Sequence, residues 1–110
     1  MFGDVGSAVI SNSGQVFFGV SSDVGSTAIC AEQAALGSMI TAGQYKIKKI
    51  VAVWKDKKGS IYVIPPCGNC RQYIKDLDAK NLETEVVLDI NKEVKLKDLL
   101  PFHDLWTKVT

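Results

Sequence analysis

Apolar and polar positions along the chain fall into short runs that predict strands, separated by two stretches with helical spacing. The runs from Val5 to Ile10 and from Gln15 to Val20 flank an Asn-Ser-Gly turn and together predict a β-hairpin. The polar stretch from Ser21 to Thr27 predicts a loop. From Ile29 to about Ala42 the sequence is rich in alanine and predicts a helix that ends before Gly43.

This first helix has an apolar side and two cap candidates. Leu36, Met39 and Ile40 recur at helical spacings. Ser26 and Thr27, just before the helix, are residue types that cap helix N-termini. We therefore expect one side of the helix to be buried, either on the sheet or against another subunit.

The second half of the chain continues the alternation of strands and helices. In chain order we expect a buried strand (Lys49 to Trp54), a strand (Ile61 to Ile64), a helix (Cys67 to about Leu77), a strand (Glu85 to Ile90) and a short helix (Leu96 to Leu100) ended by Pro101. The order β-β-α-β-β-α-β-α contains no repeat or linker. It favours one α/β domain over residues 1–110, a mixed sheet of roughly five strands with helices on its faces.

Composition and charge fit a folded domain and remove several classes of function. Hydrophobic residues make up 46% and charged residues 23% of the 110 residues, which argues against disorder. The net charge of +1 leaves no electrostatic footprint for nucleic acid or an anionic membrane. No apolar run approaches the roughly 20 residues of a membrane span, and the N-terminus lacks the pattern of a secretory signal. We therefore expect a cytoplasmic domain without nucleic-acid or membrane partners.

Three cysteines are the first feature that points to a particular chemistry. Cys67 and Cys70 form a Cys-x-x-Cys pair, and Cys30 lies 37 positions before Cys67. An odd number of cysteines fits a disulfide framework poorly and favours metal or redox chemistry. Because Cys30 and the pair each open a predicted helix, the free amides and the helix dipole favour the metal-binding thiolate.

Three thiolates suit a catalytic zinc site, because they fill three tetrahedral positions and leave the fourth for water. Glu32, two residues after Cys30, is close enough to take a proton from that water. Cys-x-Glu followed by Pro-Cys-x-x-Cys is the three-cysteine form of the zinc-deaminase signature. Three thiolates with Zn²⁺ leave a net charge of −1, and Arg71, the single arginine of the chain, is the candidate to compensate it.

Two other interpretations of the cysteines remain open from the residues alone. Cys67 and Cys70 could form a redox dithiol with Cys30 as an unrelated buried thiol. Alternatively, the zinc could be purely structural, with His103, the single histidine, as its fourth ligand. A redox site would not require Glu32 beside Cys30, and neither would a non-catalytic zinc-binding subunit.

Longer segments around these motifs resemble a known family. The chain is similar to the small homotetrameric cytidine deaminases and the related blasticidin S deaminases. The resemblance rests on the stretches Ile29 to Leu36 and Pro66 to Gln72, and extends to Val5 to Val9, Gly14 to Val20 and Leu99 to Phe102. It implies a three-layer α/β/α fold and a zinc-dependent hydrolysis that converts cytidine or deoxycytidine to the uracil nucleoside and ammonia. The alternative substrate is a non-standard cytosine nucleoside such as blasticidin S.

The resemblance also implies roles for individual residues. Glu32 would move a proton from water to N3 of the base and then to the departing amino group. The Ala31 amide and the Pro65 carbonyl would contact the base, and Phe2 and Phe102 would form apolar walls, one of them from a neighbouring subunit.

The sequence departs from the cytidine deaminases at two positions of the site. Gln33 stands where those enzymes usually carry an arginine directly after Cys-Ala-Glu. Ser21-x-Asp23 stands where they carry the Asn-x-Glu pair that holds the ribose. Ser21 and Asp23 could still bond to sugar hydroxyls, but the blasticidin-type enzymes depart from this sugar motif as well.

The resemblance and the short N-terminal stretch together predict a homotetramer. The first predicted strand begins within about five residues of Met1, where family members usually place a helix, so either a partner subunit covers part of the sheet or the chain is a truncated variant. The side of the first helix formed by Leu36, Met39 and Ile40 is the candidate contact. We also expect Phe102 or the Ser21 to Thr27 loop to reach a neighbour's site. A nucleic-acid deaminase is disfavoured, because the chain has no basic stripe.

Overall fold

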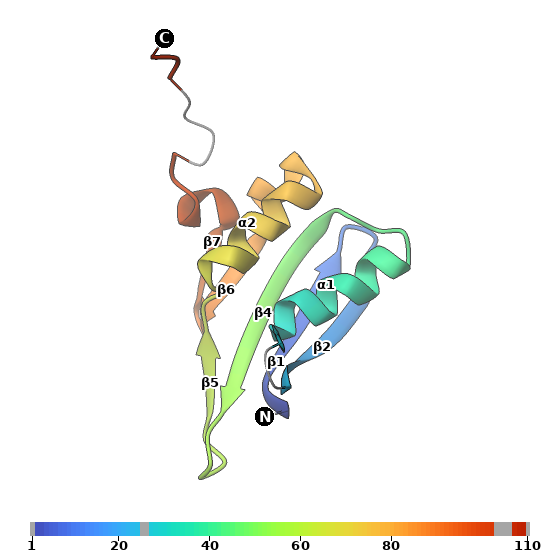
Figure 1. Cartoon of the computed structure of the whole chain (residues 1–110), viewed down its shortest axis with the longest axis vertical. Coiled ribbons are helices and arrows are strands. Elements are labelled where there is room, and N and C mark those ends of the chain that lie inside the picture. The colour runs from blue at the N-terminus through green and yellow to red at the C-terminus, as the bar shows by residue number, and fades with distance from the viewer. Residues whose placement is uncertain (1, 25–26, 103–106, 110) are drawn as a thin grey trace.

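The computed structural model describes residues 2–24, 27–102 and 107–109. In this part of the chain, one mixed sheet of seven strands is combined with two α-helices and two short 3-10 helices (Figure 1). The strands are β1 (Phe2–Ser11), β2 (Val16–Val24), β3 (Thr27–Ile29), β4 (Ile47–Lys55), β5 (Ile61–Ile64), β6 (Glu85–Asp89) and β7 (Lys92–Lys95). The helices are α1 (Ala31–Thr41), α2 (Gly68–Leu77), η1 (Ala79–Glu83) and η2 (Leu96–Leu99).

The strands are arranged around β4. The sheet order is β3-β2-β1-β4-β6-β7, and β5 pairs with the second half of β4. β4 and β6 are parallel, whereas the other strand pairs are antiparallel. A parallel pair needs a crossover connection, and α2 supplies it between β5 and β6.

The core lies on the side of the sheet that carries both α-helices. Phe17, Val9, Ile50 and Val86 form one row across β2, β1, β4 and β6. This row packs in a single cluster with residues of both helices, among them Leu36, Met39 and Ile74. Figure 1 shows α1 over β1 and β2 on the same face of the sheet as α2.

The opposite face of the sheet is apolar and exposed. Val16, Phe18 and Val20 alternate along β2 with exposed fractions of 43%, 72% and 59%. Phe18 pairs with Ala8 on β1, which in turn pairs with Val51 on β4. A groove of about 310 Å³ runs between these strands on this face.

Helix α1 lies unusually close to β2 at Gly19. A Cβ atom at Gly19 would lie 2.8 Å from the Ala34 carbonyl carbon and closer still to the backbone of Ala31 and Ala35. Real Cβ atoms do not approach other atoms so closely, so only glycine at this position allows α1 to pack at this distance from β2. Gly19 thereby sets the position of α1 and of the residues at its N-terminus.

Two buried polar side chains fasten the second half of the chain to β4. The Asn81 amide nitrogen donates to the carbonyls of Tyr45 (2.8 Å) and Ile74 (3.0 Å), and its oxygen accepts from the Ile47 N–H at 2.8 Å. The Thr84 hydroxyl donates to the Ile47 carbonyl at 2.9 Å. Both side chains are 1% exposed, so these bonds satisfy backbone groups that would otherwise be buried without partners.

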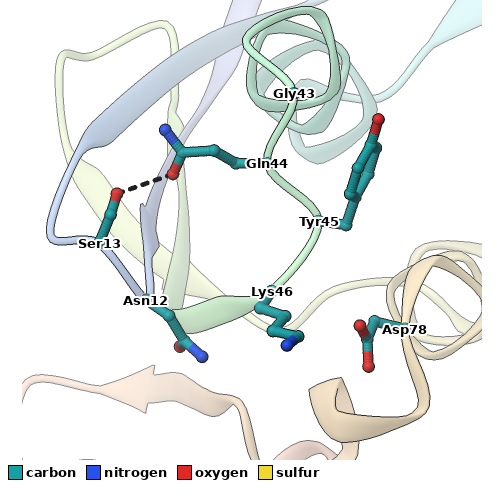
Figure 2. Close-up of a pocket in the computed structure, with 7 residues that line it drawn as sticks. All are labelled: Asn12, Ser13, Gly43, Gln44, Tyr45, Lys46 and Asp78. Atoms are coloured by element: carbon teal, nitrogen blue, oxygen red, sulfur yellow. Dashed lines mark hydrogen bonds between the residues drawn. The ribbon is translucent and has the colours of Figure 1, made fainter.

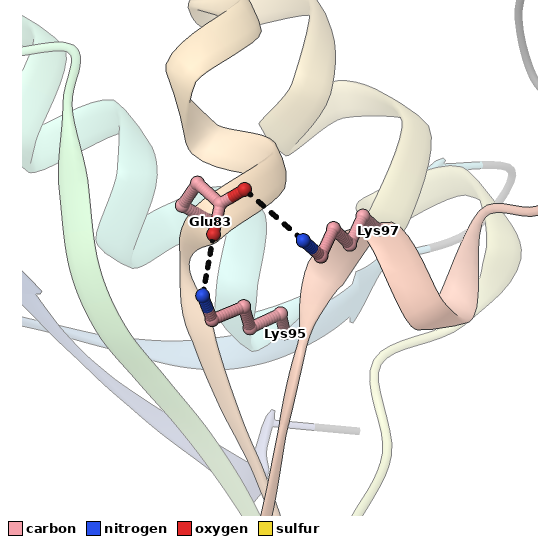
Figure 3. Close-up of polar contacts among 3 residues, drawn as sticks. All are labelled: Glu83, Lys95 and Lys97. Carbon is pink, nitrogen blue, oxygen red and sulfur yellow. Dashed lines mark hydrogen bonds and ion pairs between the residues drawn. The ribbon is translucent and has the colours of Figure 1, made fainter.

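Exposed ion pairs join the short helices to the edge of the sheet. Glu83 of η1 accepts from Lys95 of β7 at 2.7 Å and from Lys97 of η2 at 3.4 Å (Figure 3). Because solvent screens such exposed pairs, they contribute little to the free energy of unfolding. They lie outside the cavity described below.

Most of the predicted elements are confirmed, as is the α/β fold with a mixed sheet. The hairpin, both long helices and the strands after them lie within a few residues of their expected bounds. The sheet has seven strands rather than five, because β3 spans the end of the expected loop and the expected start of the first helix, and β7 follows β6 as a second hairpin. Of the three layers expected, the described residues supply two. No helix among them is long and apolar enough to cross a membrane.

The first helix differs from the expectation in its cap, whereas for its apolar side the alternative of burial in the chain's own core is confirmed. It begins at Ala31 with Cys30 as its N-cap, and Thr27 lies in β3 instead of capping it; Ser26 lies outside the described residues. Leu36 and Met39 are fully buried in the chain's own core and therefore do not form a contact with another subunit.

Candidate functional site

The two cysteine motifs lie at the N-termini of the two α-helices. Cys30 and Cys67 are the N-cap residues of α1 and α2, with extended backbone and no side-chain capping bond. Cys70 lies in the first turn of α2 and is buried. This placement confirms that both motifs open helices, where free backbone N–H groups and the helix dipole favour negative charge.

The three thiols form one cluster. Their Sγ atoms all lie within 4.8 Å of one another, and those of Cys67 and Cys70 are 3.5 Å apart. Three sulfur ligands at this spacing suit Zn²⁺, which accepts thiolates in tetrahedral geometry. Cys67 is exposed and Cys30 half-buried, so the cluster is open to solvent on the side of these two thiols.

Burial and hydrogen bonds act in opposite directions on the thiols. Burial raises the pKa of Cys30 and, more strongly, that of Cys70. Burial also opposes ionisation of Cys67, but hydrogen bonds from the N–H groups of Cys70 and Asn69 and from the Cys70 and Cys30 thiols together outweigh it and lower the pKa of this thiol. A coordinated metal ion deprotonates its thiol ligands, so a divalent cation offsets the cost of burying the cluster.

Glu32 lies beside the cluster as the second residue of α1. It is 5% exposed, and desolvation by burial raises the pKa of its carboxyl group. A carboxyl group held in this way can accept and return a proton near neutral pH more readily than an exposed one. The proton-transfer role of Glu32 stays a prediction.

A cavity of about 500 Å³ opens in front of these residues. Of the predicted site residues, it is lined by Ser21, Asp23, Cys30, Ala31, Glu32, Pro65 and Cys67. Ser21 accepts a hydrogen bond from the Val5 N–H through its hydroxyl oxygen at 3.2 Å. The cavity is therefore lined by Glu32, by two of the three thiols and by the predicted substrate-binding residues, which come from three separate segments of the chain.

Other predicted site residues are not brought to this cavity. Phe102 is 81% exposed and has a positive φ of 59°, outside the cavity wall of its own chain. Phe2 lies in β1, its side chain is outside the described part, and His103 lies outside the described residues. The Arg71 guanidinium donates to the Pro66 carbonyl at 2.9 Å and the Leu99 carbonyl at 3.4 Å, so it braces the turn that carries Cys67.

Several residues that line the cavity are not among the predicted site residues. Asp4, Val5 and Ser22 come from β1 and β2, Ala28 and Ile29 from β3, and Trp54 and Ile64 from β4 and β5. The sequence predicts a buried strand at Trp54, yet this residue is 41% exposed. Its alternation with Ala52 on the helix-bearing face is the one signal in the sequence that could have identified it.

A second cavity, of about 310 Å³, lies near the C-terminal ends of the helices (Figure 2). Its lining consists of Asn12, Ser13, Gly43, Gln44, Tyr45, Lys46 and Asp78. The Ser13 hydroxyl donates to the Gln44 side-chain oxygen at 2.8 Å. None of the predicted site residues lines it. Among the described residues, the thiol cluster is the group of metal-ligating side chains that qualifies as a metal site.

Comparison with known proteins gives consistent matches. Residues 2–85 match the family described as the cytidine and deoxycytidylate deaminase zinc-binding region. A blasticidin-S deaminase from Bacillus cereus is 37% identical over 78 residues, 66% of this chain and 56% of that protein. A cytidine deaminase from Mycoplasma genitalium is 39% identical over 66 residues, 58% of this chain and 48% of that protein. The chain thus spans about half the length of the curated relatives it matches.

A solved structure extends the likeness to the fold. The crystal structure of cytidine deaminase from Mycobacterium tuberculosis superposes with a TM-score of 0.73 at 28% identity. The superposition covers 91% of this chain and 76% of that one.

Proposed function

Because the chain belongs to the cytidine and deoxycytidylate deaminase zinc-binding family, we propose that it is a zinc-dependent hydrolytic deaminase of a cytosine nucleoside. The reaction converts cytidine or deoxycytidine to the uracil nucleoside and ammonia. The observation that carries the proposal is the buried Glu32 beside three clustered thiols at the wall of a nucleoside-sized cavity.

The chain's own residues divide the work of this reaction. Cys30, Cys67 and Cys70 would hold Zn²⁺, which supplies a Lewis acid that activates water at neutral pH. Glu32 accepts a proton from the attacking water and delivers it to N3 of the base. It then takes the second proton from the hydroxyl group newly added at C4 and passes it to the departing amino group, so the same carboxyl group acts as base and as acid.

Substrate contacts in the proposed site come from both helix N-termini and from β2. The Ala31 amide and the Pro65 carbonyl bind the edge of the base, and Ser21 and Asp23 lie where the sugar would extend. All four residues line the cavity, which supports their assignment. Arg71 adds positive charge next to the turn that carries Cys67.

Blasticidin S is the second candidate substrate, favoured by one specific observation. Ser21-x-Asp23 replaces the expected Asn-x-Glu sugar motif, and a blasticidin-S deaminase is among the similar proteins. A screen of ammonia release from cytidine, deoxycytidine, blasticidin S and a cytosine oligonucleotide tests both candidates. Turnover of the oligonucleotide alone would contradict the nucleoside proposal.

We expect the protein to bind about one zinc ion per chain. Elemental analysis after purification without added metal checks the stoichiometry. In the zinc-loaded protein all three thiols should react slowly with a thiol reagent, and a chelator should make them reactive, because removal of the metal frees the thiolates. Absence of zinc together with a Cys67–Cys70 disulfide would support the redox interpretation.

We further propose a homotetramer, the assembly implied by the family resemblance. The exposed apolar face with Phe18 and Val20 and the outward position of Phe102 support association between copies. Light scattering should give about four times the chain mass of 12.0 kDa. Phe102→Ala should raise KM without changing zinc content if Phe102 completes a neighbour's cavity. A fully active monomer at assay concentration would contradict the proposal.

A further inference from the structure

Trp54 forms part of the wall of the proposed active site, although no sequence motif assigns it a role there. It lies near the end of β4 and lines the same cavity as Glu32 and Cys67. Although β4 is the central strand of the sheet, Trp54 is 41% exposed. A large aromatic side chain that is left open to a cavity offers a surface for a ligand.

The strand register places Trp54 one row farther out than the residues next to the thiols. Ala52 pairs with Ile64, and Trp54 pairs with Tyr62, two residues earlier on β5. Two residues along a strand span about 6.6 Å. Because β5 runs from Tyr62 towards Cys67, the Trp54 row is the one more distant from the cluster. The β4–β5 hairpin extends beyond both helices, so this row lies towards the outer end of the site (Figure 1).

The indole is supported by a neighbouring aromatic ring. Its ring stacks on Tyr62 with centroids 5.4 Å apart and an interplanar angle of 26°. The Tyr62 hydroxyl donates to Asp56 Oδ2 at 3.3 Å, and Asp56 Oδ1 accepts from the N–H groups of Lys58 and Ser60, each at 2.9 Å. Tyr62 does not line the cavity. It is therefore a positioning residue that restricts the rotamers of Trp54.

The distance of Trp54 from the thiol cluster determines which part of a substrate it can contact. The reacting amino group of a cytosine must lie at the thiol cluster, so the group on N1, at the opposite side of the ring, points outwards. On the β1 side of Trp54 lies Val5, whose N–H bonds to Ser21. Ser21 and Trp54 therefore flank the same stretch of β1, at the place where the N1 substituent extends.

We propose that Trp54 is a specificity-determining residue, whose indole face packs against the group that the cytosine ring carries on N1. This proposal rests on the proposed function. It adds a structural reason why the enzyme would prefer nucleosides to cytosines that carry only a small group on N1. An indole face binds the C–H face of a sugar ring or a planar substituent by burying apolar area. The contact compensates for the short side chains at Ser21 and Asp23.

The test compares two substrates that differ only at N1. With the zinc-loaded full chain, Trp54→Ala should raise KM for cytidine about fivefold to tenfold, because an aromatic contact is lost. kcat should change less than about twofold, and kcat/KM for 1-methylcytosine should remain near the parent value. Trp54→Phe should recover part of the loss. Tyr62→Leu, which removes the support, should raise KM for cytidine less than Trp54→Ala does.

Tyr73→Ala is the matched control, because Tyr73 is an aromatic residue 38% exposed on α2 outside the cavity lining. It should leave both substrates unaffected. Equal losses for cytidine and 1-methylcytosine, or no loss for either, would overturn the role of Trp54 while the deaminase activity stands.

A measurement of cytidine binding distinguishes a failure of this proposal from a failure of the proposed function. If the parent protein deaminates no cytosine compound, calorimetry with cytidine decides. Cytidine binding that weakens about tenfold in Trp54→Ala would support the contact although the activity fails. Binding that is unchanged in the variant, or absent from the parent, would overturn it.

Discussion

Glu32→Gln should abolish most of the deaminase activity while the fold and the zinc content remain. The glutamine amide has nearly the shape of the carboxyl group, so the buried position on α1 should accept it. The amide cannot take a proton from water or return one to the base, and general acid–base catalysis contributes on the order of 10²–10⁴-fold. We expect the loss in kcat, with KM for cytidine much less affected, and steady-state ammonia release measures both.

Two companion variants make this result specific. Glu83→Gln changes the same chemical group on the exposed surface and should keep the parent rate, although it weakens the contacts to Lys95 and Lys97. Glu32→Asp keeps a carboxyl group at a shorter reach and should retain more activity than the glutamine variant. A Glu32→Gln protein that turns over cytidine at the parent rate would show that another group moves the proton.

Gly19→Ala should strongly destabilise the protein, although it adds only one methyl group. The new Cβ would meet backbone atoms of Ala31, Ala34 and Ala35, which cannot rotate away as a side chain could. Overpacking of this kind costs about 3 kcal/mol in the free energy of unfolding, and α1 has to move outwards to relieve it. A loss of that size lowers the melting temperature on the order of 10–20 °C. Thermal unfolding measures it.

Gly37→Ala is the control, since it adds the same methyl group to helix α1 itself. No atom lies within 4 Å of its Cβ position, and alanine favours helices more than glycine does. The melting temperature should therefore stay level or rise. Because α1 carries Cys30 and Glu32, Gly19→Ala should also weaken zinc binding, whereas Gly37→Ala should not. Equal stability of the two variants would contradict the steric argument.

The thiol cluster and Glu32 could be predicted because their signals are local. Cys30 and Cys67 each precede a helix, and a helix N-terminus gives its first residues a defined direction and environment. The bounds of β5 and the turn between β1 and β2 follow from turn residues for the same reason, whereas β1 begins earlier and β2 ends later than the sequence predicts. The spacing in the sequence does not show how closely the Cys30 motif approaches the Cys67–Cys70 motif, because this distance depends on the pairing of β4 with strands on both sides.

Features that depend on long-range pairing escape such local signals. β3 consists of Thr27, Ala28 and Ile29, all exposed, and is a strand because it pairs with the end of β2. β7 (Lys92–Lys95) is half lysine and has a single partly buried residue, Val94, so its composition resembles a turn. The sequence made Leu36 and Met39 candidates for a subunit contact because a helical pattern identifies an apolar side but not the partner that covers it.

The bonds of Asn81 and Thr84 to Ile47 have a consequence for how the metal is held. Cys30 belongs to the half of the chain before β4, and Cys67 and Cys70 belong to the half after it. Their meeting depends on how β4 pairs with the second half of the chain: with β5, which leads into Cys67, and with β6, where Lys49 faces Glu85 and Ile50 faces Val86. The ion and this junction are thermodynamically linked, because a ligand that binds only the folded state stabilises it by mass action. A substitution that destabilises this junction therefore lowers the affinity for the metal ion, although it lies outside the metal site. A bound ion in turn stabilises the pairing between the two halves of the sheet.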